Sequence, residues 1–112
     1  SLTGPGVSER HPYQKVAEAV ARSAEPVYTT WPYGIGETVS FYLPEGRRVP
    51  ALPDDASQLP ASFIVLYRPG VPREKSQVDA LAQAGLEHRD GGYYVAPVNP
   101  QFGTQLSFWR RP

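Results

Sequence analysis

The sequence feature that most constrains the fold is an unbroken apolar run, SFIVLYR, at Ser62–Arg68. Consecutive apolar residues without polar alternation are typical of a strand that is buried on both faces, as in a parallel sheet. The chain has 112 residues, which suits a single domain with one core. We therefore expect this strand to lie inside a sheet that helices flank.

An amphipathic helix is predicted early in the chain, with Pro12 in its first turn and Pro26 ending it. Proline suits a first turn, because its missing N–H would have no intrahelical partner there. Apolar residues recur between the two prolines at the spacing of one helical face: Tyr13, Val16, Ala17, Val20, Ala21 and Ala24.

A second helix is predicted over Pro72–Ala84. We expect Gly85 to adopt the left-handed conformation that commonly follows a helix, with Leu86 packing back on the last turn. The residues that this helix is expected to direct inward are Val78, Leu81 and Ala82.

Shorter elements are predicted between and after these helices. They are short strands at Val27–Thr30 and Arg47–Leu52, a helix of one or two turns at Glu37–Leu43, and a closing strand at Thr104–Arg111. The short helix is expected to place Val39, Tyr42 and Leu43 on one side. Residues 86–98 are predicted to form a hairpin, because the pair Gly91-Gly92 suits a tight primed turn.

The order of these elements predicts an α/β domain, a small two-layer or three-layer sandwich. Its sheet is expected to be mixed and partly parallel, with two main helices and an antiparallel extension at the C-terminal end. Residues 1–11 are expected to be a cloning scar and a flexible lead-in, and residues 12–112 a single domain. Since the sequence contains no Met, we interpret the chain as a fragment of a longer protein.

Charge and composition argue against several classes of function. Lys and Arg together number 11, as do Asp and Glu, so the formal net charge is zero. A protein that binds nucleic acid needs an excess of cations, and we expect no nucleic-acid partner. The chain has no Cys, which excludes thiol catalysis, disulfides and thiolate metal sites within it.

The segment Gly34-Ile35-Gly36 follows a predicted strand and precedes a predicted helix, as in a dinucleotide-binding turn. The third glycine of that pattern is replaced by Val39, and Glu37 places a negative charge where phosphate would bind. We interpret the two glycines as a corner between strand and helix. A degenerate Rossmann-like nucleotide-binding domain stays an alternative.

The aromatic residues of the same loop, Trp31 and Tyr33, are candidates for binding. Rings of this kind stack on sugars or lie at membrane interfaces, because each has an apolar body and a polar tip. The alternative is that they cover one end of the core. The candidate ligand-binding residues are Trp31, Tyr33, Gly34 and Gly36.

No metal ligand, cofactor or catalytic residue is assigned from the sequence. His88 and Asp90 would share one face of a strand while Glu87 points away, and two ligands make a poor metal site. Asp54-Asp55 is interpreted as a solvated turn. The chain has no Gly-x-Ser-x-Gly motif of a serine hydrolase.

One family resemblance follows from these motifs. The segment PVYTTWPYGIGETVSFYLPEGRRVPAL resembles the start of the soluble C-terminal domain of polytopic glycosyltransferases that use polyprenyl-phosphate sugars. These are the dolichyl-phosphate-mannose-protein mannosyltransferases and the lipid A aminoarabinose transferases. Val27–Thr30 would be the strand and Phe41-Tyr42-Leu43 the helix core of that pattern. The later segments SFIVLYRPG and LAQAGLEHRDGGYYVAPV, with the closing LSFWRRP, are similar to the next strand and to the final helix and strands.

The resemblance implies a periplasmic or extracellular domain that follows a large transmembrane region of the same parent chain. In that family, the catalytic acidic residues lie upstream of this domain. It implies a non-catalytic accessory domain of a membrane glycosyltransferase that helps to position the acceptor or the lipid-linked sugar donor. The alternative function is a stand-alone module that binds carbohydrate or protein.

Overall fold

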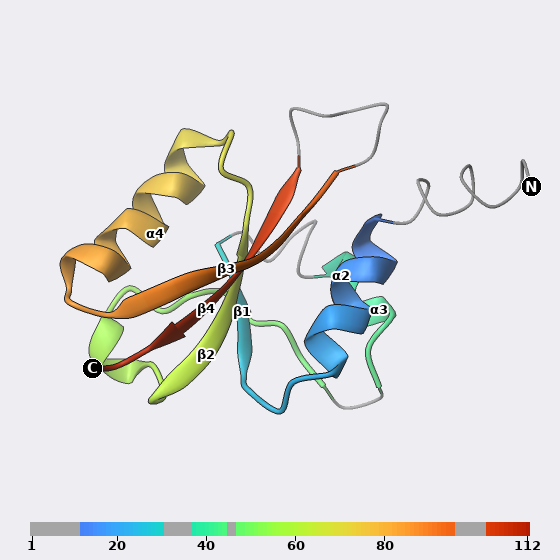
Figure 1. Ribbon diagram of the computed structural model, residues 1–112, viewed down its shortest axis with the longest axis horizontal. Coiled ribbons are helices and arrows are strands. Elements are labelled where there is room, and N and C mark those ends of the chain that lie inside the picture. The colour runs from blue at the N-terminus through green and yellow to red at the C-terminus, as the bar shows by residue number, and fades with distance from the viewer. Residues whose placement is uncertain (1–11, 31–36, 45–46, 96–102) are drawn as a thin grey trace, which may run out of the picture.

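The computed structural model describes residues 12–30, 37–44, 47–95 and 103–112 of the chain. It is an α/β domain in three layers, with a four-stranded sheet in the middle (Figure 1). Helices α2 (Pro12–Ala21) and α3 (Glu37–Phe41) lie on one side of the sheet, and α4 (Pro72–Gln83) lies on the other. The predicted fold class, a mixed sheet with two main helices, is confirmed.

The sheet has the strand order β1-β2-β4-β3. Strand β1 (Val27–Thr29) runs parallel to β2 (Ser62–Tyr67). Strand β4 (Thr104–Arg110) is antiparallel to both β2 and β3 (Glu87–Tyr94). The predicted combination of a parallel start and an antiparallel C-terminal extension is therefore confirmed.

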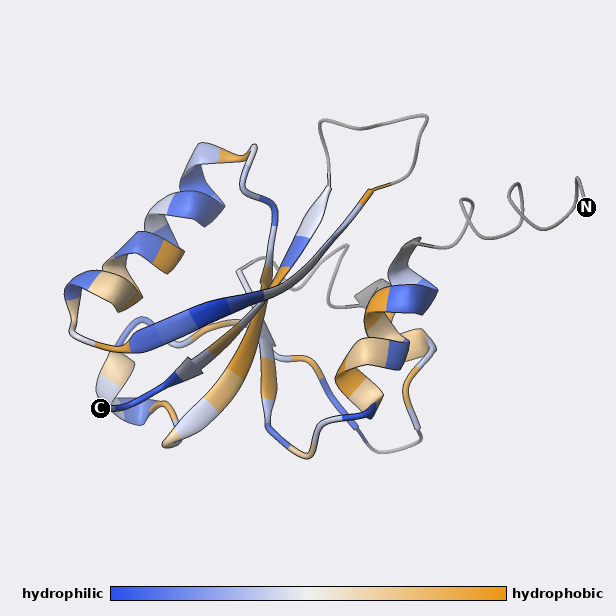
Figure 2. Cartoon of the chain, viewed as in Figure 1, coloured by the Kyte–Doolittle hydropathy of each residue, from blue (hydrophilic) through white to orange (hydrophobic). Residues whose placement is uncertain are grey.

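Strand β2 is buried on both faces, as its apolar run predicts. Figure 2 shows apolar residues gathered in β2, whereas the edge strand β3 is mostly hydrophilic. On one face, Ile64 and Leu66 pack in a cluster with α2 and α3; on the other, Phe63 and Val65 pack in a cluster with α4. Because neighbouring side chains on a strand point to opposite faces, an uninterrupted apolar run supplies both cores at once.

Helix α4 ends as the sequence predicts. Gly85 has φ of 94° and Leu86 is buried. The N–H of Leu86 donates to the carbonyl of Leu81 at 3.3 Å, and the N–H of Gly85 to that of Ala82 at 3.0 Å. These are the two hydrogen bonds of a Schellman cap. Val78 and Leu81 are buried as expected, but Ala82 is exposed.

Helix α2 ends at Ala21, well before Pro26, where its end was expected. Val16, Ala17 and Val20 form its buried face. After the last turn, the backbone N–H of Glu25 donates to the hydroxyl of Ser23. A short polar side chain offers the backbone a partner outside the helix, and the chain leaves the helix before the proline is reached.

The predicted hairpin at residues 86–98 is wrong. Strand β3 continues through Gly91-Gly92 and pairs with β4 on both sides of them, with a register shift between Asp90 and Gly92. Gly92 has φ of 142°, which a glycine adopts without strain. The glycine pair is therefore a β-bulge, one extra residue within a strand.

Two smaller expectations are also corrected. The segment 47–52 forms no extended strand, and only Ala51 makes a parallel bridge, to Thr29. Pro50 has no N–H to donate to a ladder. On α3, Val39 is buried, but Tyr42, expected on the same side, is 38% exposed.

Candidate functional site

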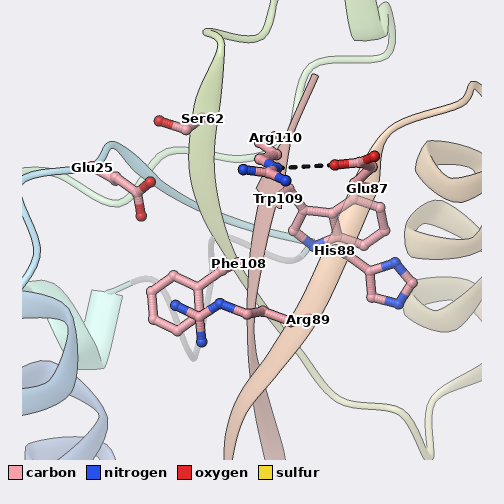
Figure 3. Close-up of a pocket in the computed structure, with 8 residues that line it drawn as sticks. All are labelled: Glu25, Ser62, Glu87, His88, Arg89, Phe108, Trp109 and Arg110. Atoms are coloured by element: carbon pink, nitrogen blue, oxygen red, sulfur yellow. Dashed lines mark hydrogen bonds and ion pairs between the residues drawn. The ribbon is translucent and has the colours of Figure 1, made fainter. Parts of the chain in front are cut away.

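A hollow of about 410 Å³ lies at the end of the sheet where β2 and β3 begin and β4 ends. Its walls come from these three strands and from the connection between α2 and β1, as Figure 3 shows. We call it the sheet-end hollow. It is lined by Glu25, Ser62, Glu87, His88, Arg89, Phe108, Trp109 and Arg110.

The central feature of the sheet-end hollow is the guanidinium of Arg89, which lies over the ring of Phe108 (Figure 3). The Arg89 Cζ atom is 4.2 Å from the ring centroid. The two residues are direct partners in the β3–β4 ladder, so the sheet itself brings them together. A guanidinium on an aromatic face is attracted by the ring quadrupole. Within the described part of the chain, no ion pair of Arg89 with a carboxylate is found.

The bulge at Gly91 makes room for this arrangement. A β-carbon at Gly91 would overlap the ring of Phe108 and would lie 2.6 Å from Cδ2 of Leu106. Only a glycine lets the Phe108 ring lie against the backbone of β3 at this position. Gly91 therefore leaves the space that the Phe108 ring occupies, and Arg89 packs on that ring.

Two carboxylates and a hydroxyl complete the wall. Glu87 accepts a hydrogen bond from Nε of Arg110 at 2.9 Å. Both side chains of this ion pair are exposed, so its contribution to stability is small. Glu25 approaches from the connection after α2, and its Oε1 accepts the hydroxyl of Ser23 at 3.3 Å. Ser62 belongs to the face of β2 that packs on α2, because it alternates with the buried Ile64.

The opposite face of the same strands carries a stacked pair of rings, of which Trp109 is buried and His88 is exposed. The ring of His88 stacks on Trp109 with centroids 4.4 Å apart, and Figure 3 shows this pair on the other side of the strands from Arg89 and Phe108. The indole N–H of Trp109 donates to the hydroxyl of Ser107 at 2.8 Å, and that hydroxyl donates to the carbonyl of Val65 at 3.1 Å. This chain of hydrogen bonds links the side chains of β4 to the backbone of β2 on that face.

A second polar cluster, around Glu74, lies at the other end of the sheet. Glu74 is 2% exposed; it accepts hydrogen bonds from the Thr30 hydroxyl at 2.8 Å and from the backbone N–H and the guanidinium of Arg68. Burial raises the pKa of Glu74, but the hydrogen bonds from Arg68 and Thr30 outweigh it and hold this pKa below its usual value. The carboxylate thus joins the start of α4 to the ends of β1 and β2, and we assign it a structural role.

The candidate residues Trp31, Tyr33, Gly34 and Gly36 lie outside the described residues. Their role in binding stays a prediction.

The other residues weighed from the sequence are placed by the structure. Glu87 pairs with Arg110 and His88 stacks on Trp109, while Asp90 is exposed on β3. Among the residues described, no three His, Cys, Asp or Glu side chains come close enough together to bind a metal ion.

The loop at Asp54-Asp55 is the solvated turn that its sequence predicts. Oδ1 of Asp55 accepts the backbone N–H of Ser57 at 3.0 Å. This hydrogen bond lowers the pKa of Asp55.

The residues that sequence reasoning missed are Arg89, Phe108 and Glu25. Arg89 and Phe108 face each other only in the register of β3 on β4. The one local signal was the glycine pair two residues after Arg89, because glycine inside a strand pattern can mark a bulge as well as a turn.

No protein-family model, curated protein or solved structure matches this chain. In the ranges that the structure covers, no helix has both the length and the apolar character needed to span a bilayer.

Proposed function

We propose that this chain is a non-catalytic accessory domain of a membrane glycosyltransferase of the polyprenyl-phosphate-sugar class, placed outside the cytoplasm. In this role it holds the acceptor or the lipid-linked donor near a membrane-embedded active site. The observation that carries the proposal is the sheet-end hollow, with Arg89 on Phe108 at its centre and carboxylates of Glu25 and Glu87 beside it.

The chemistry of this hollow suits a carbohydrate. Sugar hydroxyls donate to carboxylates and accept from guanidinium groups, and both kinds of group line the hollow. Planar side chains such as the Arg89–Phe108 stack give a sugar ring a flat surface to lie on. All three strands that form the wall belong to one hydrogen-bonded sheet, so the backbone positions that carry Glu87, Arg89 and Phe108 are fixed before a ligand arrives.

The family resemblance supports the glycosyltransferase part of the proposal. It leads us to expect a helix, a strand, a loop, a Phe-Tyr-Leu helix, a short strand and then the strand at SFIVLYRPG. The chain has α2, β1, α3 and β2 in that order, with Phe41 at the end of α3 and Tyr42 and Leu43 after it, whereas the expected short strand at 47–52 is reduced to one bridge at Ala51. Phe41 is 82% exposed, and in this proposal it contacts the transmembrane region of the parent chain.

The binding part is tested by titrating the ¹⁵N-labelled chain with glucose and following backbone amide shifts. We expect the shifts to concentrate at residues 87–89 and 108–110. The variant Phe108→Ala removes the platform and should weaken binding about tenfold or more. Phe41→Ala, which truncates an exposed aromatic residue away from the hollow, is the matched control and should bind normally. Binding that Phe108→Ala leaves intact would refute the assignment of the hollow.

The membrane part is tested on the parent reading frame upstream of Thr3. A hydropathy scan with a window of ~19 residues should find eight or more apolar spans. A short or wholly polar upstream stretch would refute the glycosyltransferase context. It would favour the stand-alone carbohydrate- or protein-binding module, which uses the same hollow without a transmembrane neighbour.

The Rossmann-like alternative has its own test. A nucleotide that binds only the folded state raises the melting temperature, so a thermal scan with and without nucleotide separates this alternative from the others. In the described sheet, β1 and β2 are the one parallel pair, which gives little support to a dinucleotide-binding fold built on parallel strands.

A further inference from the structure

The charges that line the sheet-end hollow are not equally satisfied. Arg110 has Glu87 as its ion-pair partner, and Glu25 already accepts the hydroxyl of Ser23. Arg89 rests on an aromatic ring and has no carboxylate partner within the described ranges. Within the described ranges, the charged groups of the hollow without an ion-pair partner are therefore one guanidinium, that of Arg89, and one carboxylate, that of Glu25.

This guanidinium is oriented in advance. Its face is against the Phe108 ring (Figure 3), and Arg89 is exposed, so the edges that carry its N–H groups are accessible to a ligand. A guanidinium edge matches a carboxylate with two parallel N–H···O hydrogen bonds. Because the stack already limits the rotamers of Arg89, less conformational entropy is lost when an anion binds.

We infer that the hollow binds an acidic sugar, a carbohydrate that carries one carboxylate. The carboxylate pairs with Arg89, and the ring hydroxyls face Glu25 and Ser62 across the hollow. This inference rests on the proposed function in that the ligand is a carbohydrate, and it adds the charge and orientation of that ligand.

The unpaired carboxylate in the wall limits the charge that the ligand can carry. A dianion such as a phosphate monoester would bring a second negative charge close to Glu25, with one unpaired guanidinium to meet it. A singly charged carboxylate is balanced by Arg89 alone. We therefore expect the hollow to prefer glucuronate over both glucose and glucose 1-phosphate.

The test compares glucuronate, glucose and glucose 1-phosphate by amide shift titration of the full 112-residue chain at pH 7.5. Glucuronate should bind about tenfold or more tightly than glucose, with shifts at residues 87–89 and 108–110. Arg89→Gln should reduce glucuronate binding to the level of glucose and leave glucose binding nearly unchanged. Arg89→Lys keeps the charge without the planar fork and should fall between the two. Arg48→Gln removes an exposed charge outside the hollow lining and is the matched control.

The outcomes separate this inference from the proposed function. Equal binding of glucose and glucuronate would overturn the acidic-sugar inference and leave carbohydrate binding in place. Tighter binding of glucose 1-phosphate would overturn the assignment of a single carboxylate. If none of the three ligands moves the amides of the hollow, carbohydrate binding fails together with the inference. A loss of glucuronate binding in Arg48→Gln equal to that in Arg89→Gln would show attraction by overall charge and would also overturn it.

Discussion

The substitution Glu74→Gln tests whether a buried carboxylate joins α4 to the parallel strands. Glutamine keeps the shape of the side chain and one carbonyl oxygen. That oxygen can still accept from the Thr30 hydroxyl and the Arg68 backbone N–H, as Oε1 of Glu74 does. The amide NH₂, however, would face the guanidinium of Arg68, which now donates to Oε2.

The loss can be estimated from these contacts. Two hydrogen bonds from the guanidinium to the carboxylate disappear, and hydrogen bonds to charged groups contribute roughly 1.5–3 kcal/mol each. The Arg68 side chain is 26% exposed, so water replaces part of what it loses. We expect the free energy of unfolding to fall by about 2–3 kcal/mol. For a domain of this size, that lowers the melting temperature by about 10 °C.

The pH dependence supplies a second measurement. The pKa of Glu74 is lowered in the folded state, so its stabilising effect is complete above the pKa of an unfolded glutamate, about 4.3. The effect is lost as the pH falls through the lower folded pKa. The wild-type chain should therefore lose stability below about pH 4.3, and Glu74→Gln should lose less over the same range.

Urea unfolding followed by tryptophan fluorescence measures both effects, since Trp109 is 2% exposed in the folded chain. The control is Asp79→Asn, which breaks the exposed ion pair with Lys75 and should cost at most about 0.5 kcal/mol. A loss for Glu74→Gln no larger than that of Asp79→Asn, or an unchanged acid profile, would refute the structural role of Glu74.

Two further substitutions test the strands. Gly91→Ala should lower stability by roughly 1–3 kcal/mol, because the new methyl group overlaps Phe108 and the core must shift; urea unfolding measures it, and a neutral result would contradict the close packing at the bulge. Thr29→Val should raise the free energy of unfolding by about 1 kcal/mol, because valine has the same shape without an unpaired polar group. The buried Thr29 hydroxyl finds no hydrogen-bond partner within the described ranges. A lower free energy of unfolding would show that this hydroxyl does have a hydrogen-bond partner.

The elements that the sequence predicts well are those whose signals are local. The apolar run of β2 specifies burial on two faces whatever its neighbours are. The cap of α4 depends on Gly85 and Leu86, which lie next to the helix that they end. In both cases, the residues that form the signal are also the residues that make the contacts.

The elements that were predicted wrongly depend on competition between neighbours. Pro26 would have ended α2, but the Ser23 side chain offers the backbone a partner first. The segment 47–52 has the composition of a strand. Because Pro50 has no N–H to donate, the segment makes only one bridge, between Ala51 and Thr29. The sequence pattern indicates that each of these residues can end or interrupt a helix or strand. It does not indicate at which of them the element ends.

The missed site and the mistaken hairpin have the same cause. A turn at Gly91-Gly92 would pair Arg89 with a residue shortly after the glycines, on the returning strand of the hairpin. A bulge at the same glycines lets β3 run on along β4, and Arg89 then meets Phe108 from the far end of the chain. Gly91 is required there because the Phe108 ring occupies the space of its side chain. The glycine pair is thus specified by a residue on another strand, and the cation that it positions becomes visible only when the two strands are placed side by side.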